Sequence, residues 1–147
     1  MSLTERLNND MKQAMKDKDK VRLSVIRMVR TAIKNAEIDQ QRTLSDDEVI
    51  AVLNREMKQR RDSLQAFESA GRQDLIEEVK QEIQVLIDYL PAQMTEDEVR
   101  AVVREVIAEV GAAGKSDMGK VMSALMPKVK GRADGKLVNQ IVGQELQ

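Results

Sequence analysis

Apolar residues recur every three or four positions along most of the chain, which is the spacing of one face of an α-helix. The first such stretch covers residues 3–15. Ser2, just before it, and Glu5, in its first turn, have capping-box spacing. A polar break at 16–20 separates it from a second stretch at about 21–38. We therefore predict two amphipathic helices at the start of the chain.

The same helical spacing of apolar residues predicts a second pair of helices. Ser45 and Glu48 form another capping box, and the long helix that they open is predicted to end near Gly71, a natural left-handed stop. A fourth apolar stripe covers 73–90, so the two helices should fold back on each other as an antiparallel hairpin. The four helices predict an N-terminal, four-helix bundle-like domain at 1–91.

The rest of the chain predicts three shorter helices. Each start is marked by a side chain that can cap it: Thr95, Ser116 and Asp134. The first should end at Gly111, and Pro127 should lie at or just past the end of the second. These helices predict a small C-terminal domain at 95–147. No stretch alternates in the manner of a β-strand, so the fold class is all-α.

Composition removes several kinds of chemistry. The chain has no cysteine and no histidine, which excludes Ser-His and Cys-His nucleophiles and the common zinc sites. We expect no catalytic residues, no cofactor and no metal. The longest apolar run is 49–53, far short of the roughly 20 residues of a membrane span. The amphipathic N-terminus lacks a hydrophobic signal core, so we expect a cytoplasmic protein.

Charge divides by sign in the C-terminal part. Residues 115–136 hold six Lys or Arg against two carboxylates, whereas 92–114 hold two against five. The basic segment precedes a predicted helix N-terminus, where free N–H groups favour phosphate. The candidate phosphate-binding residues are Lys120, Lys128, Lys130, Arg132, Lys136 and Asn139. Two alternatives stay open: a solvated basic loop, and for Asn139 a role in fixing the loop.

Further basic residues could extend such a surface across the N-terminal domain. They are Arg27, Arg30, Lys34, Lys58, Arg60 and Arg61. Charges on exposed helix faces are commonly solvated or paired with neighbours, which is the competing interpretation. Residues 1–91 carry 16 basic and 17 acidic side chains, so this domain offers no global attraction to RNA.

Several short motifs carry a family resemblance. Residues 119–122 (GKVM) and 130–139 (KGRADGKLVN) resemble the signature of the GatB/YqeY family, and 61–63 (RDS), 70–75 (AGRQDL) and 89–91 (YLP) resemble its free-standing YqeY-like members. The resemblance implies a helical domain homologous to the tail of the B subunit of glutamine-dependent tRNA amidotransferases. That tail contacts tRNA, while the carbon–nitrogen ligase chemistry, with glutamine as amido donor, resides elsewhere in the assembled enzyme.

The resemblance and the basic segment together suggest a non-catalytic module for folded RNA, with tRNA as the first candidate. The alternative is a protein–protein adaptor that docks on an enzyme, such as one acting on aminoacyl-tRNA, without direct RNA contact. One residue pair departs from the family pattern: Asp134-Gly135 stands where the amidotransferase tails more often have Asn-Pro. The only aromatic residues are Phe67 and Tyr89, both on apolar stripes, so any RNA would be read through its shape and backbone.

Overall fold

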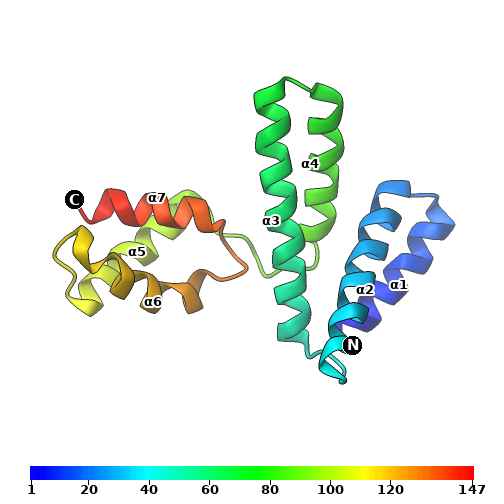
Figure 1. The fold of residues 1–147 in the computed structure, drawn as a ribbon, viewed down its shortest axis with the longest axis horizontal. Helices are drawn as coiled ribbons and strands as arrows, with labels where there is room; N and C mark the ends of the chain where they lie inside the picture. The colour runs from blue at the N-terminus through cyan, green and yellow to red at the C-terminus, as the bar shows by residue number, and fades with distance from the viewer. The chain divides into compact units, whose positions relative to one another are not determined.

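The computed structural model describes residues 1–147, and it consists of helices joined by short turns (Figure 1), which confirms the all-α prediction. Its contacts divide the chain into two compact units, 1–90 and 91–147. The N-terminal unit contains α1 (Leu3–Asp17), α2 (Lys20–Gln40), α3 (Asp46–Ala70) and α4 (Gln73–Ile87). The C-terminal unit contains α5 (Glu96–Val110), the 3₁₀ helix η1 (Lys115–Asp117), α6 (Met118–Val129) and α7 (Gly135–Glu145). None of these helices has the length and apolar character of a membrane span.

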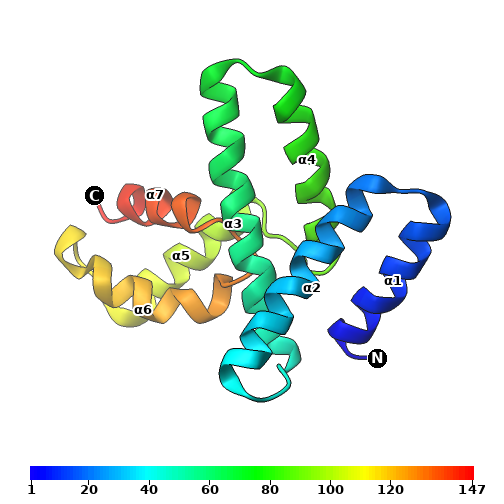
Figure 2. The ribbon, with the colours of Figure 1, turned by 45° about the vertical axis from the view of Figure 1, so that its right-hand side comes forward.

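The N-terminal unit is built from two helical hairpins. Figures 1 and 2 show α2 running back along α1, and α4 running back along α3, as the bundle-like prediction requires. Ser2 and Ser45 form the expected capping boxes, and Gly71 ends α3 with a φ of 67°. Between the helices lies a core whose largest fully buried members are Leu7, Ile26, Leu53, Met57 and Leu86. Full burial of a side chain of this kind is worth about 1.5–3 kcal/mol, so the core outweighs any single cap.

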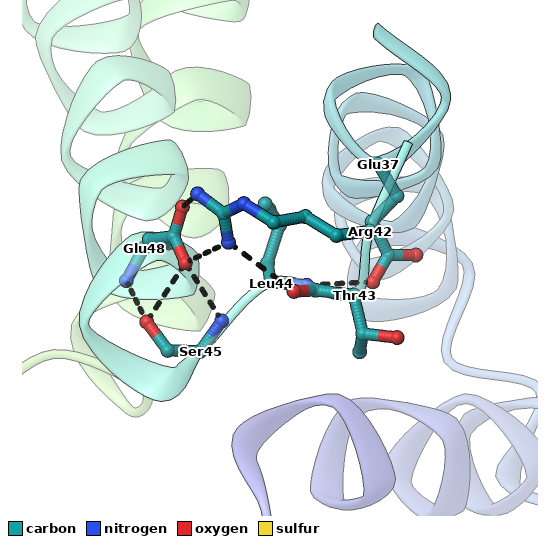
Figure 3. A network of polar contacts seen from close by, with 6 residues as sticks. All are labelled: Glu37, Arg42, Thr43, Leu44, Ser45 and Glu48. Atoms are coloured by element: carbon teal, nitrogen blue, oxygen red, sulfur yellow. Dashed lines mark hydrogen bonds and ion pairs between the residues drawn. The ribbon is translucent and has the colours of Figure 1, made fainter. Parts of the chain in front are cut away.

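The connection between α2 and α3 is fixed by a polar network (Figure 3). Arg42 donates from Nη1 to Oε1 of Glu48 over 2.7 Å, and the Ser45 N–H donates to the same carboxylate over 3.1 Å. Glu37 accepts from the Leu44 N–H over 3.0 Å, and the Leu44 side chain is buried in the core. The guanidinium and then the N–H group lower the pKa of Glu48 to about 2. The network around the Ser45 cap therefore connects the two hairpins and fixes the residue at which α3 begins.

The fourth helix is shorter than its apolar stripe predicts. The helix ends at Ile87 rather than near Leu90, and Tyr89 lies in a turn with its side chain buried. The Tyr89 hydroxyl donates to the carboxylate of Asp10 in α1. Pro91 also disfavours helical backbone in the residue before it. A tertiary contact and a proline together end the helix before its apolar pattern does.

The C-terminal unit corrects two local predictions. Ser116 does not cap α6 but lies inside η1, and Asp117, at the N-cap position, accepts instead from the Ala113 N–H over 2.9 Å. Pro127 lies inside α6, which continues to Val129. The side chain of Val129 is buried in the core, and this burial offsets the one backbone hydrogen bond that proline cannot make.

Other predictions for this unit are confirmed. Thr95 opens α5 with a capping box, Gly111 ends it with a φ of 67°, and Asp134 caps α7. The core of the unit comprises Val99, Val103, Val106, Val121, Leu125, Val129, Val138, Ile141, Val142 and Leu146. It consists of aliphatic side chains from all three helices, so α6, α7 and the turn between them are packed against α5.

Candidate anion-binding surface of the C-terminal unit

The turn from α6 to α7 carries most of the candidate phosphate-binding residues. We call residues 128–136 the basic loop. The Lys130 N–H donates to the Met126 carbonyl and the Arg132 N–H to the Val129 carbonyl, both over 2.9 Å. Between them Gly131 has a φ of 77°, in the left-handed region where a side chain would be strained. The glycine thus lets the chain reverse within a few residues.

The basic loop is held from the other side by the segment that precedes α5. The Met94 N–H donates to the Arg132 carbonyl over 2.8 Å, and the Gln93 side-chain amide donates to the Gly131 carbonyl over 2.9 Å. In return, Nε of Arg132 donates to the carbonyl of Ala92 over 2.9 Å. Arg132 is therefore partly a structural residue. Sequence reasoning missed Gln93 and Met94, because nothing in local spacing links them to a loop about 40 positions later.

The lysines of this region divide into two places. Lys128, Lys130 and Lys136 are exposed on the basic loop. Lys128 lies 3.5 Å from a carboxylate oxygen of Glu109 in α5, in a solvent-exposed pair that costs little to break. Lys120 precedes Lys128 by eight residues on α6, which places it about 12 Å away along the helix axis. The structure therefore separates Lys120 from the other cations.

The first turn of α7 adds hydrogen-bond donors beside these cations. Asp134 accepts from the Lys136 N–H over 3.2 Å, whereas the N–H groups of Gly135 and Leu137 have no acceptor in the chain. Asn139 is exposed one turn further on, and its side chain makes no hydrogen bond to the loop. The helix dipole makes this end positive, so the basic loop leads directly into a helix end that favours an anion.

The remaining arginines of the unit are neutralised internally. Arg100 and Arg104 donate to the two carboxylate oxygens of Glu145 over 2.8 and 3.1 Å, which joins α5 to the end of α7. Arg104 and then Arg100 lower the pKa of Glu145. Apart from these two arginines, the basic side chains of the unit are those of the basic loop together with Lys115 and Lys120.

The basic residues proposed for the N-terminal unit differ in their exposure. Arg27, Lys34 and Lys58 are exposed, and Arg61 is half-buried. The half-buried Arg30 donates to the side chain of Asn8 over 2.7 Å and thereby joins α2 to α1.

Arg60 requires a correction. Arg60 is only 6% exposed, and its guanidinium nitrogens lie 2.7 Å from a carboxylate oxygen of Glu56 and 3.7 Å from one of Glu82. It is buried because α3 turns this position toward α4, which helix spacing within α3 alone does not reveal. Arg60 is thus unavailable to an external phosphate.

Comparison with known proteins decides the family. The model of a family described as Yqey-like protein matches residues 4–146. The chain belongs to the YqeY-like family. This YqeY-like chain is 30% identical over 145 residues to "altered inheritance of mitochondria protein 41, mitochondrial" of Pyrenophora tritici-repentis, covering 94% of the chain and 80% of that protein. Its counterpart in Kluyveromyces lactis is 36% identical over 107 residues, covering 71% of the chain and 58% of that protein.

A different class of relative is similar to part of the YqeY-like chain. A glutamyl-tRNA(Gln) amidotransferase subunit of Thermococcus gammatolerans is 32% identical over 87 residues, which is 56% of the chain and 14% of that protein. The corresponding protein of Thermococcus sibiricus is 40% identical over 58 residues, or 37% of the chain and 9% of that protein. The relation to amidotransferase subunits expected from the motifs is therefore confirmed at the level of the family.

The expected cytoplasmic localisation is contradicted by these similarities. The fungal relatives are named as mitochondrial proteins. The lack of a hydrophobic signal core argued only against secretion and could not distinguish the cytoplasm from an organelle. We withdraw that expectation.

Proposed function

We propose that residues 95–147 form a non-catalytic domain that binds folded RNA, with tRNA as the first candidate, and that 1–91 form a separate helical domain. The observation that carries the proposal is that the exposed Lys128, Lys130 and Lys136 belong to the same short loop as the free N–H groups at the start of α7. The guanidinium of Arg132 adds charge at the same place through the nitrogens that the Ala92 carbonyl does not use.

The chemistry of this surface suits a phosphate backbone. Phosphate contacts from lysine and from helix N-termini position a protein on nucleic acid without reading its sequence. The C-terminal unit contains no aromatic side chain, so it has no platform on which an unpaired base could stack. Recognition would therefore depend on the spacing of phosphates in a folded RNA.

The relatives support this choice of polymer. The partial matches are to proteins whose name specifies a glutamyl-tRNA(Gln) amidotransferase. As part of the proposal, we extend the association with tRNA to this chain. We propose that amide transfer itself is carried out by other domains or proteins. Four phosphate contacts would give a slope of about −3 to −4 when the logarithm of the binding constant is plotted against the logarithm of salt concentration.

The test measures fluorescence anisotropy of bulk tRNA and of a duplex DNA of equal charge at three salt concentrations. The variant is Lys128→Ala/Lys130→Ala/Lys136→Ala, which leaves the structural contacts of Arg132 in place. The control is Lys12→Ala/Lys16→Ala/Lys80→Ala, which removes the same charge from exposed positions of the N-terminal unit. We expect tighter binding to tRNA than to DNA, and a salt slope that falls by about 3 in the first variant only.

Two results would reject this function. Equal binding to tRNA and to duplex DNA would show that the surface is a non-specific basic patch. Equal losses in both triple variants would show that net charge alone is responsible. A partner bound with weak salt dependence would instead support the protein-adaptor alternative.

Asp134 provides a finer test, because its carboxylate opposes any phosphate at the α7 N-terminus. Asp134→Asn keeps a side chain that can cap the helix while removing a negative charge. We expect tRNA to bind several-fold more tightly at low salt, with an unchanged melting temperature. Asp134→Ala, the matched variant, should lose about 1 kcal/mol of stability. Unchanged tRNA affinity in Asp134→Asn would place the phosphate away from this helix end.

A further inference from the structure

A cavity in the N-terminal unit is separate from the basic loop. Its volume is about 390 Å³, and it lies where α3 and α4 run side by side (Figure 1), with Met28 of α2 at its edge. Its walls include Arg60, Ser63, Phe67, Leu75, Val79 and Glu82. This volume is within the range of roughly 300–1,000 Å³ that is typical of small-molecule sites.

The antiparallel register of the hairpin gives the cavity two different ends. Arg60 lies 3.7 Å from Glu82. Counting along the two helices from this pair brings Phe67 opposite Leu75, near the turn between α3 and α4. The cavity is thus apolar at one end and charged at the other. Between the ends the small side chain of Ser63 lines the wall, where a larger residue would fill the space.

The charged end has an excess of carboxylates. Arg60 is the one cation of the cavity wall, and it is already neutralised by a 2.7 Å contact with Glu56. Its Nε is buried without a hydrogen bond, so Glu82 only partly satisfies it. Glu78 also lines the cavity, one helical turn from Glu82 on α4, and has no cationic partner. The carboxylates of Glu56 and Glu82 therefore face a single guanidinium, and Glu78 adds an exposed carboxylate one turn away.

An excess of negative charge beside an apolar wall favours a cationic ligand. Burial raises the pKa of Glu82, the charge of Arg60 partly offsets this increase, and the neighbouring charge of Glu78 adds to it. A bound cation would stabilise the charged form of Glu82 and pair with the exposed Glu78, while an apolar body would cover Phe67 and Leu75. The exposed side chain of Met28, 42% accessible, is a flexible apolar surface that can adapt to such a body.

We propose that this cavity binds a small organic cation with an apolar body, such as a primary amine on an aliphatic chain, with the ammonium at Glu78 and Glu82 and the chain between Phe67 and Leu75. The site does not depend on the RNA-binding proposal, because the basic loop lies in the other unit. A phosphate or a carboxylate ligand would be repelled from the same place.

The experiment follows the Met28 methyl resonance in the full chain by NMR during titration with hexylamine, hexanol or hexanoate. Ligands of this size are expected to have dissociation constants in the millimolar range. We expect saturable shifts with hexylamine, and at least fivefold weaker binding of the neutral and anionic analogues. A peptide carrying one lysine among apolar residues forms a further arm, and tighter binding of that peptide than of hexylamine would overturn the small-ligand assignment in favour of a protein partner.

Three variants test the geometry. Glu82→Gln should weaken hexylamine binding about fivefold, whereas Glu77→Gln, on the same helix but outside the cavity, should leave it unchanged. Ser63→Leu should abolish binding by filling the space, with folding checked by the fluorescence of Tyr89. Absence of a saturable shift in the wild type, or equal losses in Glu82→Gln and Glu77→Gln, would overturn the proposal.

Discussion

Arg60 allows a quantitative test of how charge is managed inside the N-terminal unit. Arg60→Met keeps much of the side-chain volume but removes the cation. Removing one partner of a fully buried ion pair costs about 3–5 kcal/mol, because the other charge is left uncompensated. The side chains of Glu56 and Glu82 are 15% and 23% exposed, so water can reach them after the change. We therefore expect a smaller loss, about 2 kcal/mol at neutral pH.

The pH dependence separates charge from packing. Burial raises the pKa of Glu82 and the charge of Arg60 partly offsets this increase, so removal of Arg60 should raise that pKa further. A carboxyl with a raised folded-state pKa stabilises the protein below its unfolded-state pKa and loses this contribution as pH rises through the folded-state pKa. The deficit of Arg60→Met should therefore be small near pH 4, about the unfolded value for glutamate, and complete near pH 7.5.

The assay uses a natural reporter of this unit. Tyr89 is the only tyrosine, tryptophan is absent, and the C-terminal unit has no aromatic residue. Urea unfolding followed by tyrosine fluorescence thus reports the N-terminal unit alone. The double variant Arg60→Met/Glu82→Gln should recover at least half of the loss at neutral pH. A deficit of equal size at both pH values, or no recovery in the double variant, would refute the electrostatic reasoning.

Further predictions concern the units and their polar contacts. Fragments 1–90 and 91–147 should each unfold cooperatively in calorimetry. A fragment without a helical signal in circular dichroism would contradict the proposed domain division. Burial and then a carboxylate acceptor raise the pKa of Tyr89, so its protonated hydroxyl stabilises the fold below about pH 10. This contribution is lost as pH rises through the folded-state pKa. Tyr89→Phe should cost about 1 kcal/mol in urea unfolding at pH 7 and should abolish this loss at high pH. Arg42→Ala should return the pKa of Glu48 from about 2 toward about 4.3 in a carboxyl NMR titration, and an unmoved pKa would contradict the network of Figure 3.

The fold could be predicted where its causes are local. Capping boxes depend on side chains three residues apart, and left-handed stops depend on a single glycine, so Ser45, Thr95, Gly71 and Gly111 marked helix ends correctly. The hydrophobic spacing of each helix indicated the inward face for the same reason. Pro127 was placed at or just past the end of its helix because proline was weighed by its backbone effect alone. The burial of side chains around it is a tertiary effect, which local spacing does not include.

The candidate sites were less predictable, because the environment of a charge depends on distant segments. Arg60 and Arg61 are adjacent in sequence, yet one is buried against α4 and the other is half-buried. Arg132 was expected to contribute only charge, whereas its Nε binds the Ala92 carbonyl. The cavity between α3 and α4 had no sequence signal, since apolar and acidic positions on α4 also describe an ordinary amphipathic helix.

The two basic residue types are used differently in this chain, and this difference bears on what its surface can recognise. Arginines such as Arg22, Arg42 and Arg100 join separate segments through paired or forked contacts with carboxylates. Lys128 of the basic loop, by contrast, makes a solvent-exposed ion pair with Glu109 over 3.5 Å. A planar guanidinium recognises an acceptor in a fixed geometry, whereas an ammonium group acts as a mobile point charge. A surface whose accessible charge is mainly lysine should follow a phosphate backbone without reading bases, and its affinity should depend strongly on salt.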